Sequence, residues 1–197
     1  MRNLYLRDRA TDSGATVIHD QNGRQCYLLT GKWGLRHDAL SLYTMSGELL
    51  AEVRQLSLGI MPKFALYQNH QRVGTVGKSL GFFKEIVYIQ GISWLIVGNG
   101  INNHYRFLQG HRLVATMAPV NKTGFNITEL AVHDEADEPL AILVATILNH
   151  WSHNGDKLPL VNRLRQHFGR KASEASPCDF TFDKFISKMH SLDPRHH

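Results

Sequence analysis

One stretch, residues 138–151, constrains the fold of this chain more than any other part of the sequence. Residues 140–148 carry no charge, so a helix formed here is apolar on every side. Such a helix must be buried on all sides or lie in a bilayer. Spanning a bilayer takes roughly 20 apolar residues, and this stretch is too short for that. We therefore expect the rest of the chain to wrap around a central hydrophobic helix.

Acidic residues lead into this helix. Asp137 is the predicted N-cap, and Pro139 falls in the first turn, where its missing N–H costs nothing. Asp137 and Glu138 also place negative charge at the positive end of the helix dipole. We therefore interpret the carboxylates of residues 134–138 as helix-capping groups and not as an acid–base pair.

The chain before the helix consists of short alternating runs joined by tight turns. Two of these turns place a glycine after Asn or Ser, at Gly23 and Gly47, and we expect positive φ at both because such hairpin turns require it. The turn at Asn69-His70 is a weaker signal of the same kind. The segments that share this hairpin pattern are residues 16–29, 40–53, 64–76 and 105–117.

The hairpins recur at a spacing of roughly 24 residues, which favours stacked hairpins over independent strands. Residues 86–97 continue the strand pattern, and residues 125–132 form the last predicted strand. A solenoid is the rival interpretation of any repeat, but it offers no lumen for an apolar helix. The predicted fold class is therefore mainly β: a closed antiparallel β-barrel around the central helix, with a short helical C-terminal tail. Closure also removes exposed strand edges.

The succession of hairpins, the Gly-Lys-Trp-Gly of residues 31–34, the Leu-Gly-Phe-Phe-Lys of residues 80–84 and the acidic turn before the apolar helix resemble the LURP-one-related family. That family is related to the Tubby C-terminal domain and the phospholipid scramblases. The resemblance covers residues 1–151 and implies a barrel of about 12 strands around a hydrophobic helix. Its motifs are structural, and fold does not imply function. Tubby-like relatives bind phosphoinositides through basic residues, but no such motif matches here, so no site is carried over.

Residues 152–197 are predicted to form a C-terminal extension. Residues 159–168 have the pattern of a short helix that ends before Gly169, with Leu160, Leu164 and Phe168 on one face. A second apolar series at helical spacing begins at Phe182. The basic residues that cluster in the extension are Lys157, Arg163, Arg165, Arg170 and Lys171.

Two interpretations of this basic helix stay open. Its apolar face packs on the protein's own barrel or on a second copy, which supplies the surface that a short helix needs in order to fold. Alternatively, its basic side chains bind anionic phospholipid or a protein partner. We favour packing.

The charge distribution argues against a nucleic-acid partner. The net charge is +5, but residues 1–151 carry 14 Lys and Arg against 12 Asp and Glu, whereas residues 152–197 carry 8 against 5. The predicted strands contain no basic stripe with interleaved aromatic residues. We therefore expect no specific binding of nucleic acid.

No motif in the sequence predicts catalysis or a cofactor. The twelve histidines have no metal-ligand spacing, and Cys26 and Cys178 are too far apart to suggest a disulfide framework. Ser57 and Ser79 are interpreted as turn residues because Gly-x-Ser-x-Gly is absent. There is also no glycine-rich phosphate loop and no apolar signal segment. We expect a cytoplasmic protein, with peripheral membrane association left open, and no enzyme, cofactor or metal site.

The expected function is a non-enzymatic binding or scaffold module of the LURP-one-related type, with anionic phospholipid as a candidate ligand. The alternative is a protein–protein interaction module that acts through the basic tail, and an enzyme with an unrecognised site is the least favoured. The apolar helix is expected to serve as core and not as a lipid anchor, because exposing it would forfeit ~25 cal/mol per Å² of apolar surface.

Overall fold

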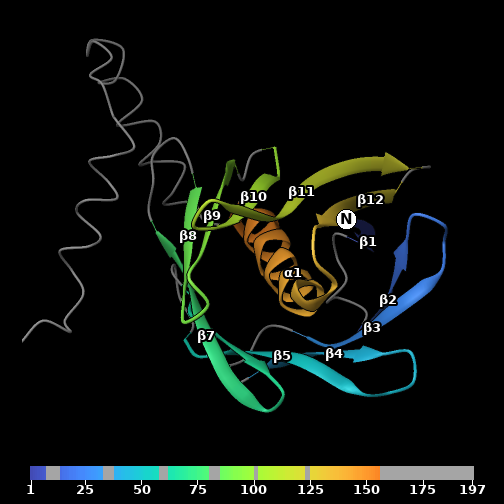
Figure 1. Cartoon of the computed structure of the whole chain (residues 1–197), viewed down its shortest axis with the longest axis horizontal. Helices are drawn as coiled ribbons and strands as arrows, with labels where there is room; N and C mark the ends of the chain where they lie inside the picture. The colour runs from blue at the N-terminus through green and yellow to red at the C-terminus, as the bar shows by residue number, and fades with distance from the viewer. Residues whose placement is uncertain are drawn as a thin grey trace, which may run out of the picture. The chain divides into compact units, whose positions relative to one another are not determined.

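The computed structural model describes residues 1–7, 14–32, 38–57, 62–79, 85–99, 102–122 and 125–155. These residues form twelve β-strands, a short 3₁₀ turn and one α-helix (Figure 1). The strands are β1 (Arg2–Arg7), β2 (Ala15–Asp20), β3 (Gln25–Gly31), β4 (Ala39–Thr44), β5 (Leu49–Gln55), β6 (Phe64–Gln68), β7 (Gln71–Ser79), β8 (Glu85–Gln90), β9 (Trp94–Asn99), β10 (His104–Gln109), β11 (Arg112–Lys122) and β12 (Phe125–Val132). The 3₁₀ turn is η1 (Glu135–Asp137), and the helix is α1 (Glu138–Gly155).

The strands form one closed antiparallel barrel. Each strand pairs with its neighbours in sequence, and β1 closes the circle by pairing with β12 from Arg2↔Val132 to Arg7↔Ile127. This result confirms the predicted mainly β class, the closure and the strand number, and it excludes the solenoid. The strand β1 was not predicted, because six residues at the start of the chain carry too weak an alternation to stand out.

The hairpin turns have the predicted backbone geometry. Gly23 has φ of +76° and Gly47 has φ of +92°, which confirms the expectation for both. The turn at Asn69-His70 has positive φ at both residues, 51° and 63°, as a two-residue turn of the primed kind needs. The repeated pattern in the sequence therefore marks true hairpins.

The stretch 86–97 differs from the sequence interpretation, because it folds as two strands and not as a continuation of one pattern. A tight turn over residues 91–93 separates β8 from β9, with φ of +108° at Gly91 and +56° at Ser93. A Cβ atom at Gly91 would lie 2.2 Å from the carbonyl oxygen of Val73. Gly91 is thus required both by its φ and by the close approach of β7.

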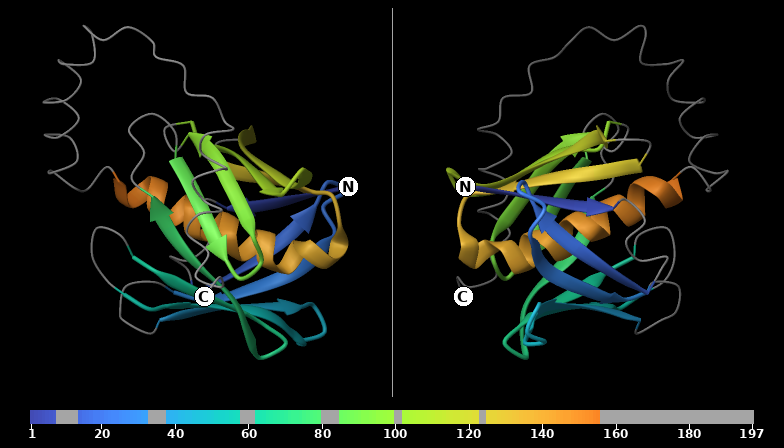
Figure 2. Two further views of the ribbon diagram at one scale, coloured as in Figure 1. Left: turned by 60° about the vertical axis from the view of Figure 1, so that its left-hand side comes forward. Right: turned by 90° about the vertical axis from the view of Figure 1, so that its right-hand side faces the viewer.

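The helix α1 is buried along most of its length, as predicted. Every residue from 138 to 149 is buried, and the apolar ones belong to the same core cluster as the inward side chains of the strands. The helix contacts β4 and β5 on one part of the barrel and β12 on another. It continues as one helix to Gly155, four residues beyond the predicted end (Figure 2).

A short 3₁₀ turn precedes the helix. The turn η1 ends at Asp137 and leads directly into α1, so Asp137, the predicted N-cap, is the residue immediately before the helix. Asp134 caps η1, because its carboxylate accepts a hydrogen bond from the Ala136 backbone N–H at 3.1 Å. The Asp137 Oδ2 atom lies 2.9 Å from Nη1 of Arg112.

In the part of the chain that the structure describes, no helix is both long enough and apolar enough to cross a membrane. The predicted helices of the extension lie beyond residue 155, outside the described residues.

Candidate functional site

The basic residues predicted as a lipid or partner site all lie outside the described residues. They are Lys157, Arg163, Arg165, Arg170 and Lys171. The site that they would form therefore stays a prediction. The domain boundary at residue 151 also stays a prediction.

Two of the sequence interpretations fall on described residues. Among those residues, no group of three or more His, Cys, Asp or Glu side chains could hold a metal ion. Ser57 acts as a turn residue, because its Oγ accepts a hydrogen bond from the Lys63 backbone N–H at 3.0 Å. The described structure instead brings together two polar clusters that sequence reasoning did not single out.

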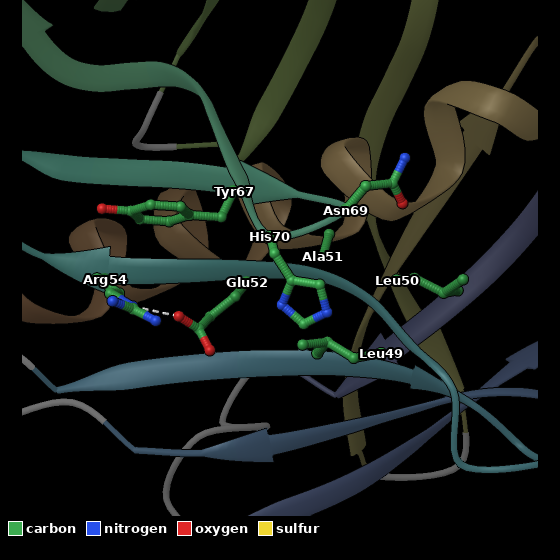
Figure 3. A pocket seen from close by; sticks show the side chains of 8 residues that line it. All are labelled: Leu49, Leu50, Ala51, Glu52, Arg54, Tyr67, Asn69 and His70. Atoms are coloured by element: carbon green, nitrogen blue, oxygen red, sulfur yellow. Dashed lines mark hydrogen bonds and ion pairs between the residues drawn. The ribbon is translucent and has the colours of Figure 1, made fainter.

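The first cluster, called the barrel-wall site below, consists of Glu52, Arg54 and Tyr67 on the outer face of β5 and β6. Strand register explains why they meet. Glu52 pairs with Tyr67 and Arg54 pairs with Ala65, so successive outward positions of β5 lie beside those of β6. Figure 3 shows the three side chains close together, with an ion pair between the two β5 residues.

Within the barrel-wall site the guanidinium of Arg54 is held from two directions. Its Nε donates to Oε1 of Glu52, and its Cζ lies 4.8 Å from the centroid of the Tyr67 ring. The other carboxylate oxygen of Glu52 accepts from Ser41 Oγ at 3.3 Å. The hydrogen bond and the charge of Glu52 both raise the pKa of Arg54, so the side chain stays cationic at all working pH values.

A recess of about 230 Å³ opens beside the barrel-wall site. Both polar and apolar residues line it (Figure 3). The residues that line it are Leu49, Leu50, Ala51, Glu52, Arg54, Tyr67, Asn69 and His70.

Two further cations lie on the same outer face. Arg72 pairs with Tyr67 across the hairpin, and its Nη2 donates to Thr75 Oγ1 at 2.6 Å. Lys63 is exposed two residues before Ala65, which is itself paired with Arg54. Glu52 is the one carboxylate among the four charged side chains Glu52, Arg54, Lys63 and Arg72, so this group is net positive.

The second cluster, called the end cluster below, lies at the N-terminal end of α1 and consists of Arg2, Tyr27 and Glu138. The Tyr27 hydroxyl donates to Oε2 of Glu138 at 2.6 Å, and Nη1 of Arg2 lies 3.2 Å from the same oxygen. The Glu138 side chain is only 1% exposed. The other donor arm of Arg2 reaches Cys26 Sγ at 2.9 Å, so the end cluster ties β1, β3 and α1 together.

Burial dominates the acid–base properties of the end cluster. It raises the pKa of Glu138 above its ordinary range, although hydrogen bonding from Tyr27 and the charge of Arg2 both act to lower it. Burial also raises the pKa of Tyr27, and the hydrogen bond to Glu138 raises it further. An open recess of about 420 Å³ beside the cluster is lined by Arg2, Cys26, Tyr27, Met45 and Pro139, among others.

Sequence reasoning missed both clusters for different reasons. In sequence, Glu138 lies 111 residues from Tyr27 and 136 residues from Arg2, and only barrel closure brings them together. The barrel-wall site did carry a local signal, because Glu52 and Arg54 are two residues apart on a predicted strand and must share a face. The aromatic partner on the next strand depends on register and could not be assigned.

The chain and its fold resemble known proteins. A model of the LURP-one-related family matches residues 2–149, nearly the whole of the described chain. The chain belongs to the LURP-one-related family. This confirms the resemblance inferred from the sequence motifs.

This LURP-one-related protein is similar to a curated bacterial protein and, in fold, to a solved plant structure. The uncharacterized protein YxjI of Bacillus subtilis (strain 168) is 19% identical over 157 residues, which cover 79% of this chain and 97% of that protein. An X-ray structure of an Arabidopsis thaliana protein matches with a TM-score of 0.52 and 17% sequence identity, covering 76% of this chain and 90% of that one. The structural likeness supports the fold alone.

Proposed function

We propose that this LURP-one-related protein is a non-enzymatic binding or scaffold module that uses its exterior and not its interior. The observation that carries the proposal is that every residue from 138 to 149 is buried, and that the apolar ones from Leu140 to Leu148 share one hydrophobic cluster with the inward side chains of the strands. A module built in this way has a rigid interior of apolar side chains and offers its outer wall, its ends and its extension to partners.

The same proposal makes α1 a central helix that fills the barrel. Its contacts with β4, β5 and β12, strands well separated around the ring, support that position. Polar contacts hold each end, through Glu138 at one and Asn149 at the other. Releasing the helix as a lipid anchor would expose this core and break both sets of contacts, so the lipid-anchor role is not part of the proposal.

Anionic phospholipid is the candidate ligand of the extension. A basic amphipathic segment gains about 1 kcal/mol per Lys or Arg near an anionic surface, and that gain falls as salt increases. The test is flotation of the full chain with neutral vesicles and with vesicles containing phosphatidylserine. We expect salt-sensitive flotation with the anionic vesicles alone, lost when Arg163, Arg165 and Arg170 are all replaced by Gln.

The second candidate is a protein-interaction module, in which the apolar face of the extension packs on a protein surface. A matched variant separates the two, because Leu164→Ala removes an apolar contact and leaves every charge in place. Loss of stability by ~2–5 kcal/mol in Leu164→Ala, with the triple Gln variant silent in flotation and thermal melts, would favour packing of this face on the protein's own barrel or on a second copy. Absence of flotation with anionic vesicles at low salt would remove lipid from the proposal.

A further inference from the structure

We propose that the barrel-wall site is a docking surface for a protein segment that presents a carboxylate next to an apolar side chain. The inference rests on the exterior-binding function proposed above and names a partner class for one defined surface. It concerns β5, β6 and β7 and makes no use of the basic extension.

The guanidinium of Arg54 is held in one orientation and, within the described chain, still has free donor groups. Its Nε donates to Glu52 and its Cζ lies over the Tyr67 ring, and among the described residues its two Nη groups have no further hydrogen bond or ion pair. About half of the side chain is exposed. The fork is thus fixed in orientation before any ligand arrives, so little side-chain entropy is lost on binding. A planar carboxylate fits such a fork with two parallel hydrogen bonds.

The second step is charge complementarity. The Glu52 carboxylate is already paired with Arg54 and Ser41, whereas Lys63 and Arg72 add two cations to the same face. This net positive face attracts an acidic segment and speeds its encounter. The nearby Glu52 also repels a dianionic phosphate more strongly than a singly charged carboxylate, which favours Asp or Glu side chains over a phosphorylated group.

The third step is the recess beside the fork. Leu49 and Leu50 line it together with Glu52, and the Tyr67 ring lies against the guanidinium of Arg54. Arg and Tyr are enriched among the residues that dominate binding energy at protein interfaces, where they stand next to packed apolar contacts. A fixed fork next to a small recess recognises two side chains at a set spacing. A fluid layer of lipid headgroups does not present such a pair.

The experiment is selection from a library of random peptides displayed on phage, using the full chain. Clones retained by the wild type and lost on Arg54→Gln are sequenced. We expect these clones to share Asp or Glu beside Leu, Ile, Met or Phe. A selected peptide is then synthesised with a fluorescent label, along with its amide counterpart carrying Asn or Gln in place of the acid.

Fluorescence polarisation measures the binding of both peptides. We expect Arg54→Gln and the amide peptide each to weaken binding at least tenfold, which corresponds to about 1.4 kcal/mol. Arg106→Gln is the matched control, because Arg106 is an exposed arginine on an outward position of β10 away from this face. It should change binding less than about threefold, and equal melting temperatures of both variants would show that the fold is intact.

Three outcomes would overturn the inference. They are the absence of any clone that depends on Arg54, a selected set without acidic residues, and an equal loss of binding in Arg54→Gln and Arg106→Gln. Anionic vesicle flotation that is lost in Arg54→Gln would also overturn it, by assigning the face to a membrane. The triple Gln variant of the extension should leave peptide binding unchanged. Failure of the lipid proposal and failure of the barrel-wall proposal can therefore be distinguished.

Discussion

The two ends of α1 are held by side chains of different chemistry. At the N-terminal end the buried carboxylate of Glu138 takes hydrogen bonds from Tyr27 and Arg2. At the C-terminal end the Asn149 amide donates to Thr128 Oγ1 at 3.1 Å and accepts from the Asn103 amide at 2.7 Å. The first set is ionisable, and the second is neutral.

This difference teaches where pH can act on the barrel. A buried charge is costly to keep without partners, whereas neutral amides and hydroxyls need only mutual hydrogen bonds. Both ends fix the helix, and the end cluster does so through groups that gain or lose a proton. Near Asn149 the Trp151 ring also lies 5.8 Å from the Phe64 ring, which adds apolar packing.

The largest expected effect lies between the two ends. Ala145 is fully buried, and Ala145→Asp would place an unpaired carboxylate in the core. We expect no cooperative thermal transition and a loss of near-UV circular dichroism, even though the contacts at both ends of α1 are unchanged. A variant that melts cooperatively near the wild-type temperature would contradict the burial of α1.

The next effect tests the neutral end. Asn149→Ala removes the side-chain amide that links Thr128 and Asn103. The polar atoms that it paired then lose their hydrogen bonds to it, which should lower the free energy of unfolding by roughly 3 kcal/mol. Urea unfolding across a pH series should show the same loss at each pH. A loss that varied with pH would show that the neutral end is coupled to an ionisable group.

A smaller effect is expected at the end cluster. Tyr27→Phe removes the hydroxyl that donates to Glu138 and should cost about 2 kcal/mol, as expected for a hydrogen bond to a charged group. Because that hydrogen bond lowers the pKa of Glu138, its removal should raise this pKa further. Urea unfolding measures the cost, and carboxyl-carbon NMR titration measures the pKa. An unchanged titration of Glu138 would contradict the hydrogen bond.

The smallest expected effect is a change of the free energy of unfolding with pH. The folded pKa of Glu138 is raised above the ordinary value of 4.5, so the folded protein holds this proton more tightly than the unfolded chain. The associated stability is fully present below about pH 4.5 and is lost as the pH rises through the folded pKa. We expect the free energy of unfolding of the wild type to fall relative to Glu138→Gln over this range. An opposite or flat difference would mean that the hydrogen bonds outweigh burial.

The sequence predicted those parts of the molecule that depend on local chemistry. Positive φ at Gly23 and Gly47 follows from turn geometry, and burial of α1 follows from an uncharged surface on every side. The 3₁₀ turn that precedes the helix, capped by Asp134, was not predicted, because several acidic residues in a row offer more than one candidate cap.

The parts that could not be predicted depend on register and closure. Glu138 looked like one more capping carboxylate, but it faces Tyr27 and Arg2, which reach it only after β1 closes the barrel. The stacking of Arg54 on Tyr67 likewise requires the exact offset of β5 against β6, and a shift of one residue would point one of them inward. The alternation of residues along a strand shows which residues share a face, but it does not show which residues of the neighbouring strand lie beside them.

Native-state hydrogen exchange of the α1 amides most directly tests whether the helix is a permanent core and binding is left to the exterior. Amides of residues 142–148 should exchange only through global unfolding, with a free energy equal to that from urea unfolding. This protection should be unchanged when vesicles containing phosphatidylserine are added. Exchange of these amides through a lower-energy local opening, or loss of their protection on vesicles, would contradict a fixed helix and support its release toward lipid.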